Sequence, residues 1–307
     1  MERNTEHDPL KGLIYALVGT VLLGCNFVTA KYALAGFNPQ TFSAIWSTAA
    51  AFFALVIAIF TRDVRYLAVP RDTMPALMLF GFSSACAMLF GWSGLKLIDP
   101  SFSSFIWRFA PVIAIIAGAL VFKEHLRVLE LVAVALMLCG SLVSTLGRWE
   151  IVGWGFLLTL ASAAFTGITA VVAKLSVARL RPNVLVFYRV ACAVPFTIAW
   201  VLITGALDLN VPVRYWIVTC LGALLGPCLS FVFTFRAYRY WDLSRASMVQ
   251  IIQPLIVMPL AYAFLARLPA MRELLGGMVI LAGGLWIALI QLSRKPNPTG
   301  PRVIRDG

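Results

Sequence analysis

The sequence predicts an all-α integral membrane protein with ten transmembrane helices, arranged as two inverted repeats of five helices each. Three observations predict this fold: an apolar composition, about ten long apolar runs, and a match of the chain to itself at a shift of 143 residues. Of the 307 residues, 61% are hydrophobic and only 12% are charged, whereas soluble domains carry about 25% charged residues. Much of the surface is therefore expected to face lipid.

The apolar runs have the length of membrane spans, because a spanning helix needs about 20 apolar residues. Prolines or clusters of charge separate the runs, and the loops are too short for a soluble domain. The predicted spans are Leu13–Leu34, Phe42–Phe60, Met74–Leu95, Phe102–Phe122, Val128–Leu146, Trp154–Val172, Val184–Ile203, Trp216–Phe235, Met248–Leu265 and Met271–Leu292.

The basic residues give an orientation. The chain has 25 Lys and Arg against 13 Asp and Glu, but the basic residues lie between apolar runs and form no basic domain, which argues against nucleic-acid binding. Seventeen fall on one side of the predicted membrane and six on the other, with Arg108 and Arg189 inside spans. The positive-inside rule places both termini in the cytoplasm, which requires an even number of spans.

The shift of 143 residues aligns uncommon residues as well as apolar ones. It pairs Lys31 with Lys174, Pro39 with Pro182, Asp99 with Asp242, Pro111 with Pro254, and Glu130 with Glu273. The predicted units are a first repeat at 1–148, a second repeat at 149–294 and a cytoplasmic tail at 295–307. Because five spans is an odd number, the second repeat enters the membrane in the opposite sense. Inverted repeats are typical of secondary transporters, whose substrate site lies between the repeats within one chain, so we expect a functional monomer.

The stretch Leu23-Gly24-Cys25-Asn26-Phe27-Val28-Thr29-Ala30-Lys31 resembles the first-helix signature of EamA-type transporters, in the drug/metabolite transporter superfamily. Glu124, thirteen residues after Pro111, and Arg189, seven after Pro182, are similar to further features of that family. The resemblance covers nearly the whole chain. It implies export or exchange of small metabolites by alternating access in the bacterial cytoplasmic (inner) membrane. The length and helix count are similar to those of exporters of aromatic and other neutral amino acids.

The two repeats depart from each other at family positions. Trp46 stands where the second repeat has Arg189, and Arg267 stands where the first repeat has Glu124. A symmetric ion site is therefore not expected.

Polar and aromatic residues at helical spacing mark a candidate substrate cavity. Polar groups at membrane depth are costly unless they face protein or water, and an aromatic and Met surface suits large apolar solutes of varied shape. The candidate residues are Asn26, Ser84, Met88, Trp92, Ser104, Trp107, Arg108, Phe231, Phe235, Ser247, Gln250 and Gln253.

Several of these residues allow two interpretations. Arg108 could hold a substrate carboxylate by a two-pronged contact, or it could serve a structural partner. Asn26 could bind substrate or a neighbouring helix. Pro111 and Pro254 could permit helix bending or form static kinks. A separate pair, Lys31 and Lys174, would anchor helices at opposite membrane interfaces, with gating as the alternative.

The sequence contains no Asp, Glu or His in the middle of a predicted span, which favours uncoupled export or exchange over proton coupling; carboxylates at span ends could still respond to protons. It has no GxxxxGK[ST] motif, catalytic set or metal-binding cluster, so we expect neither ATP hydrolysis, enzymatic activity, a cofactor nor a bound metal. The expected partners are a small-molecule substrate and the lipid bilayer. The alternatives are an exporter of nucleosides, sugars or cations, a channel, or a non-transporting membrane subunit.

Overall fold

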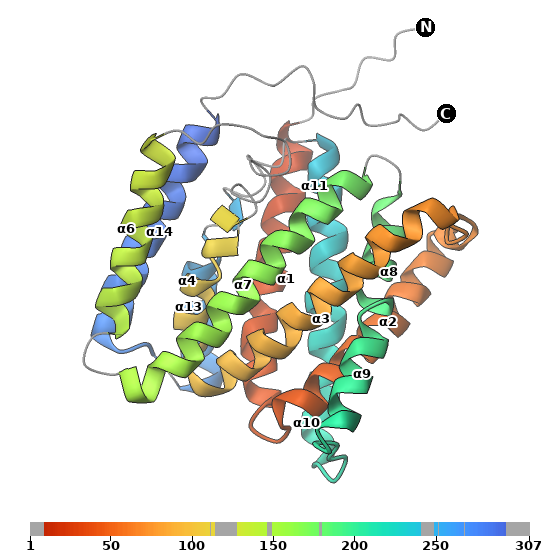
Figure 1. Ribbon diagram of the computed structural model, residues 1–307, viewed down its shortest axis with the longest axis horizontal. Coiled ribbons are helices and arrows are strands. Elements are labelled where there is room, and N and C mark those ends of the chain that lie inside the picture. The colour runs from red at the N-terminus through yellow and green to blue at the C-terminus, as the bar shows by residue number, and fades with distance from the viewer. Residues whose placement is uncertain are drawn as a thin grey trace, which may run out of the picture.

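The computed structural model describes residues 9–110, 112–113, 128–145, 149–177, 180–240, 249–250, 252–266 and 268–292, and all regular structure in them is helical (Figure 1). The first repeat holds α1 (Pro9–Ala33), α2 (Pro39–Phe60), η1 (Asp63–Tyr66), η2 (Arg71–Thr73), α3 (Met74–Leu97), α4 (Pro100–Ile106) and α6 (Val128–Thr145). The second holds α7 (Trp149–Val177), α8 (Pro182–Ala191), α9 (Val194–Ile203), α10 (Val213–Ala223), η3 (Leu224–Ser230), α11 (Phe231–Tyr240), α13 (Gln253–Leu265) and α14 (Met271–Leu292).

Prolines fix where several helices begin. Pro39, Pro100 and Pro182 lie in the first turns of α2, α4 and α8, where the missing N–H breaks no helical hydrogen bond. The side chain of Asn38 caps α2 by accepting a hydrogen bond from the backbone N–H of Thr41 at 2.7 Å. The prolines that divide the apolar runs in the sequence thus mark helix starts.

Six helical segments of the described chain are long and apolar enough to cross a membrane. They are Leu10–Ala33, Pro39–Phe60, Arg71–Leu97, Gly153–Ala173, Pro182–Ile203 and Val213–Ala237. Shorter apolar helices cover Leu131–Gly140 and Gln253–Leu265. Parts of the predicted fourth and ninth spans lie at 114–127 and 241–248, outside the described residues, so the count of ten spans stays a prediction.

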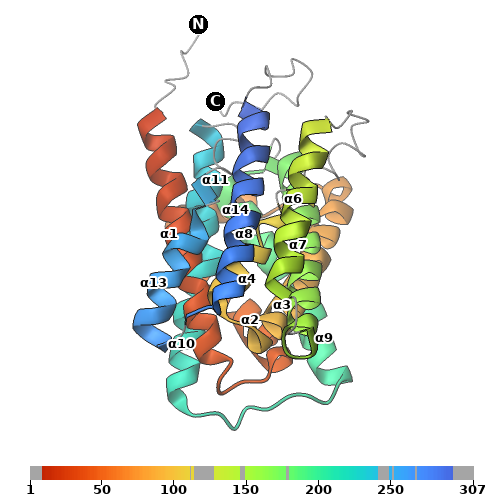
Figure 2. The same ribbon diagram turned by 90° about the vertical axis from the view of Figure 1, so that its left-hand side faces the viewer.

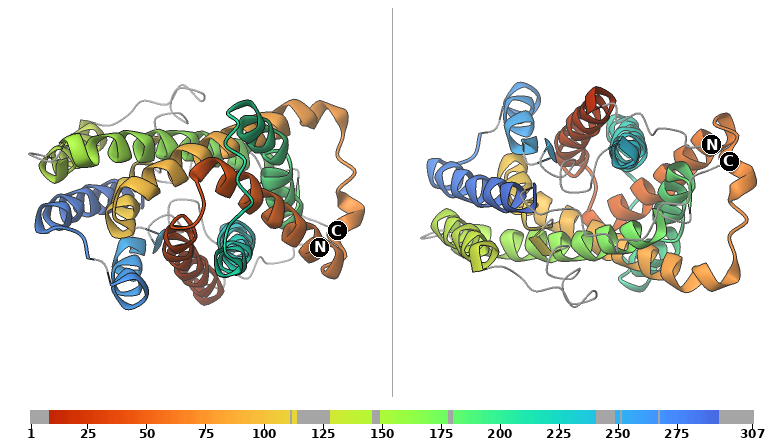
Figure 3. Two further views of the ribbon diagram at one scale, coloured as in Figure 1. Left: turned by 90° about the horizontal axis from the view of Figure 1, so that it is seen from below. Right: turned by 90° about the horizontal axis from the view of Figure 1, so that it is seen from above.

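Helices of one repeat pack mainly on helices of the other. α1 packs against α10, η3 and α11, and α3 packs against α7, which is the same contact with the repeats exchanged. α2 packs against α8, α4 against α13, and α6 against α14, so each of these three helices of the first repeat meets its own counterpart (Figure 3). The equivalent helices α1 and α7 run in opposite directions (Figure 1). The repeats therefore interlock along most of their length.

Backbone geometry repeats as well. Arg62 and Gly205, 143 residues apart, have φ angles of 58° and 61° and end the helices α2 and α9. Each follows a threonine whose hydroxyl donates to a carbonyl of the preceding turn at 2.8 Å: Thr61 to Ile57 and Thr204 to Trp200. Left-handed backbone is costly for a residue with a Cβ. The left-handed conformation at Arg62 nevertheless matches that of Gly205, so the two repeats share this turn although the residue types differ.

The second repeat is less regular than the predicted spans. Its second span divides into α8 and α9, because Pro195 has no N–H to continue the helix through Cys192 and Ala193. The next span is interrupted by η3, a π-helical segment that contains Pro227. Within the helix predicted at Met248–Leu265, residues 249–250 are helical, Ile252 lies in a turn, and α13 begins at Gln253. We find α7 longer than predicted, at Trp149–Val177.

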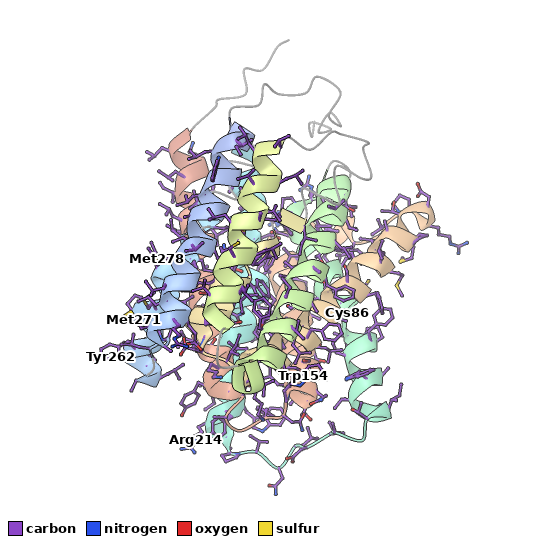
Figure 4. The ribbon with its side chains drawn as sticks, turned by 60° about the vertical axis from the view of Figure 1, so that its left-hand side comes forward. Cys86, Trp154, Arg214, Tyr262, Met271 and Met278 are labelled. Carbon is purple, nitrogen blue, oxygen red and sulfur yellow. The ribbon has the colours of Figure 1, made fainter. Side chains whose placement is uncertain are left out.

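α1 begins, and α14 ends, at the same end of the molecule, which is the upper end in Figures 1 and 2. The opposite, lower end carries the connections from α1 to α2 and from α9 to α10. Large apolar side chains cover the outside: Trp154 on α7 is 72% exposed, and Tyr262 and Met271 are similarly exposed on α13 and α14 (Figure 4). Such a surface is expected of helices that contact lipid.

Candidate functional site

Arg108 lies at the contact between α4 and α13. Its side chain is only 4% exposed. The guanidinium donates to the backbone carbonyl of Gln250, to the side-chain oxygen of Gln253 and, through Nε at 3.3 Å, to the carbonyl of Ser104. Every nitrogen of the group thus has a protein partner, and two of these partners come from the opposite repeat. These contacts favour the structural interpretation of Arg108.

Several predicted cavity and bending residues lie near Arg108 in the sequence or the structure, and only some of them are among the described residues. Gln253 is fully buried and its Nε2 has no hydrogen-bond partner. Pro254 occupies the first turn of α13, and residues 249–250 before it are also helical. Trp107 packs edge-on against Phe27 with ring centroids 5.4 Å apart. The candidates Pro111 and Ser247 lie outside the described residues.

An aromatic cluster, formed by Trp46, Met88, Trp92, Phe231 and Phe235, lies between the repeats within the largest apolar core of the chain. The rings of Trp46 and Trp92 meet edge to face at 5.0 Å, and those of Phe231 and Phe235 at 5.6 Å. Met88 and Trp92 share one face of α3 with Ser84, as the four-residue spacing predicts. These side chains are turned into the protein rather than toward lipid.

Within the predicted spans, six buried polar atoms of the described residues have no hydrogen-bond partner. Burial of such an atom without a partner costs roughly 1–3 kcal/mol, and each therefore calls for an explanation. The atoms are Asn26 Oδ1, Trp46 Nε1, Ser84 Oγ, Trp92 Nε1, Arg189 Nε and Gln253 Nε2. The set includes donors and acceptors, and two of the donors belong to indole rings of the aromatic cluster.

Asn26 lies directly on the backbone of η3. A Cβ added to Gly226 would overlap the side chain of Asn26, so glycine is needed for this close approach. The equivalent contact in the other half joins Thr169 to Ser83 by a hydrogen bond of 2.9 Å between their hydroxyls. The polar pair is thus satisfied in one half, whereas Asn26 Oδ1 remains unpartnered in the other.

Lys31 ties the lower end of α1 to the end of α3. Its ammonium group donates to the carbonyls of Leu95, Lys96 and Ile98 at 2.5, 3.0 and 2.7 Å. These carbonyls lie at a helix C-terminus, where a cation is favourable. The side chain of Lys174, its repeat partner, lies outside the described residues. Lys31 therefore holds two helices together at one end of the molecule.

Trp46 and Arg189 were not among the predicted cavity residues, although the structure makes both of them candidates. Both are buried, at 4% and 7% exposure, and each has an unpartnered ring or guanidinium N–H. The repeat could have pointed to them, because Trp46 and Arg189 occupy equivalent positions but one is aromatic and the other is charged. Within the described residues neither Arg108 nor Arg189 forms an ion pair, and the ion pair of Arg181 with Asp63 lies at the upper end. The same residues contain no group of His, Cys, Asp and Glu able to hold a metal ion.

Two interlocked helical repeats, an apolar outer surface and a polar-lined aromatic interior define a multi-pass membrane protein. The family model named EamA-like transporter family matches residues 10–146 and again residues 153–289. The chain therefore belongs to the EamA-like transporter family, and the two matches begin 143 residues apart, at the shift that the sequence itself showed.

Comparison with solved structures supports the fold. A chain described as "Crystal structure of protein" superimposes with a TM-score of 0.63 at 17% identity, and the alignment covers 92% of this chain and 99% of that one. No curated protein matches the sequence. Members of this family are membrane transporters of small molecules, and the family match leaves the substrate open.

Proposed function

We propose that this protein is a secondary transporter that exports aromatic and other neutral amino acids by alternating access between its two repeats. The observation that carries the proposal is the set of buried charged and polar groups that lack a partner of opposite charge or a hydrogen-bond partner. Two buried guanidinium groups, Arg108 and Arg189, have no carboxylate partner among the described residues. Unpartnered donors and acceptors accompany them, beside the aromatic cluster.

This set of groups favours a zwitterion over a cation. An organic cation would meet two buried positive charges in a medium that screens them weakly, and no described carboxylate faces it. An amino acid presents a carboxylate to the buried donors and an ammonium group to acceptors such as Asn26 Oδ1 and Ser84 Oγ. The rings of Trp46 and Trp92 would hold an aromatic side chain edge to face, which adds about 0.5–1.5 kcal/mol beyond burial.

For the membrane location of the protein and for the energy source of transport, we propose what the sequence predicts. We place the protein in the bacterial inner membrane, with the upper end of Figure 1 in the cytoplasm, because the loops rich in Lys and Arg lie there. Alternating access by rocking of one repeat against the other is the mode of inverted-repeat carriers. We infer uncoupled export or exchange by a monomer, since the predicted spans carry no central acid or histidine.

Transport by the purified chain in liposomes tests this proposal. We expect L-phenylalanine, L-tryptophan and L-leucine to move down their gradients, with unchanged flux when a proton gradient is collapsed at fixed substrate gradient. Liposomes without protein give the background. Competition by amino acids, nucleosides, sugars and organic cations then ranks the substrate classes. Robust flux of sugars, nucleosides or cations without flux of any neutral amino acid would contradict the proposal.

A further inference from the structure

We infer that Arg189, seated against the π-helical segment η3, is the group that binds the carboxylate of the transported solute. This inference deepens the proposed function and rests on it for the choice of substrate. It assigns to Arg189 the role that the sequence left open, as one of two interpretations, for Arg108.

The two buried arginines differ in how much of their hydrogen-bonding capacity the protein uses. Arg108 has a protein acceptor on each of its three nitrogens. Arg189 donates only through Nη2, to the carbonyl of Pro227 at 3.3 Å, and its buried Nε has no partner. A guanidinium can offer two parallel N–H groups to one carboxylate. Of the two, only Arg189 keeps nitrogens available for such a contact.

The surroundings of Arg189 hold its guanidinium in a fixed orientation. The group lies over the ring of Phe231, with the central carbon 3.5 Å from the ring centroid. Stacking on the ring and the bond to Pro227 together define the plane of the group, so the unused Nε–H has a set direction. A preoriented donor loses little rotational freedom when a ligand binds.

The π-helical segment is an unusual support at this position. Pro227 within it has no N–H, and the hydroxyl of Ser230 donates to the carbonyl of Gly226 instead of leaving that carbonyl to the helix alone. Interruptions of this kind are frequent at functional sites. The first repeat has Ser84 at the position of Pro227 and a regular helix α3. The departure from regular structure thus occurs only beside the arginine, among the described parts of these two helices.

The position of Trp46 completes the argument. α2 and α8–α9 lie antiparallel and are joined at both ends, by Arg181 with Asp63 above and by Asn38 with Ala206 below. Trp46 is seven residues from the lower end and Arg189 seven from the upper end, so a rise of 1.5 Å per residue separates them by about 10 Å along the axis. An aromatic amino acid is long enough to place its carboxylate at Arg189 and its ring at Trp46.

Binding of three related probes tests this assignment. They are L-phenylalanine, 3-phenylpropionate, which lacks the amine, and phenethylamine, which lacks the carboxylate. We would measure each by quenching of tryptophan fluorescence on the full chain in lipid nanodiscs. The wild type is expected to bind both carboxylates at least about tenfold more tightly than phenethylamine, a preference of about 1.4 kcal/mol. Arg189→Gln should reduce that ratio to about one, and Arg189→Lys should keep part of it because the charge remains.

Arg108→Gln is the matched control, since it removes the other buried guanidinium, and it should keep the ratio. Monodisperse elution and a cooperative unfolding transition would establish that each variant is folded. An unchanged ratio in Arg189→Gln, an equal loss in Arg108→Gln, or a wild type without preference for carboxylates would overturn the inference. If the wild type prefers 3-phenylpropionate through Arg189 but moves no amino acid in liposomes, only the proposed function fails.

Discussion

Arg181 donates a hydrogen bond to the carboxylate of Asp63 at 3.0 Å, and this contact joins the start of α8 to the turn after α2. Asn183 donates to the second carboxylate oxygen of Asp63 at 2.7 Å. The repeat-related contact lies at the opposite end of the same helix pair. There Asn38 and the hydroxyl of Thr41 both donate to the carbonyl of Ala206 at 2.7 Å.

The two contacts occupy equivalent positions but use different acceptors. Asp63 corresponds to Ala206, and Arg181 corresponds to Asn38, under the 143-residue shift. A charged side chain therefore closes the upper end, whereas a backbone carbonyl closes the lower end. Ion pairs that are partly exposed weaken as salt screens them, and neutral hydrogen bonds do not.

Asp63→Ala should lower stability by about 1 kcal/mol in low salt, because it removes the acceptor of Arg181 and Asn183. The thermal midpoint in detergent would fall by about 2–4 °C. The loss should shrink in 0.5 M NaCl. Asn38→Ala, the matched change at the other end, should cost about as much through loss of the α2 cap and of the bond to Ala206, but with no change in salt. Equal salt dependence in both variants would contradict the conclusion that an ion pair joins the upper ends of the helices and neutral hydrogen bonds join the lower ends.

The sequence predicted the larger part of this architecture because the repeat carries it. The 143-residue shift and odd span number led to the inverted repeats, and the four-residue spacing of Ser84, Met88 and Trp92 led to the inward face of α3. The partners of the arginines could not be predicted. The hydrogen bonds of Arg108 depend on where α13 begins, and those of Arg189 depend on the π-helical segment at Pro227. Both features follow from packing against the other repeat.

Arg108→Ala should destabilise the protein, because it leaves the side-chain oxygen of Gln253 and the carbonyl of Gln250 buried without their donor. We expect a loss of about 2–3 kcal/mol, seen as a thermal midpoint lower by about 5–10 °C. Arg214→Ala is the control, because Arg214 is exposed at the lower end (Figure 4) and, among the described residues, bonds only to Tyr215, so it should change the midpoint by less than about 1 °C. Flux per folded Arg108→Ala molecule should fall less than the yield of folded protein. A stable variant with greatly reduced flux would instead indicate direct contact with substrate.

Gly226→Ala should affect both stability and transport, because the added Cβ would collide with the side chain of Asn26 and come within 2.9 Å of its Cβ. The contact involves the base of the side chain as well as its end, so α1 and η3 must separate, at a cost of about 1–3 kcal/mol. Gly284→Ala is a matched change within a helix, since a Cβ there meets nothing within 4 Å. It should leave stability unchanged or raise it by up to about 1 kcal/mol through helix propensity. Thermal unfolding in detergent and amino-acid flux in liposomes, both compared with wild type, would measure the two effects. If Gly226→Ala matched Gly284→Ala in both assays, α1 and η3 would not be in close contact in the working protein, and Asn26 would have no place at the substrate site.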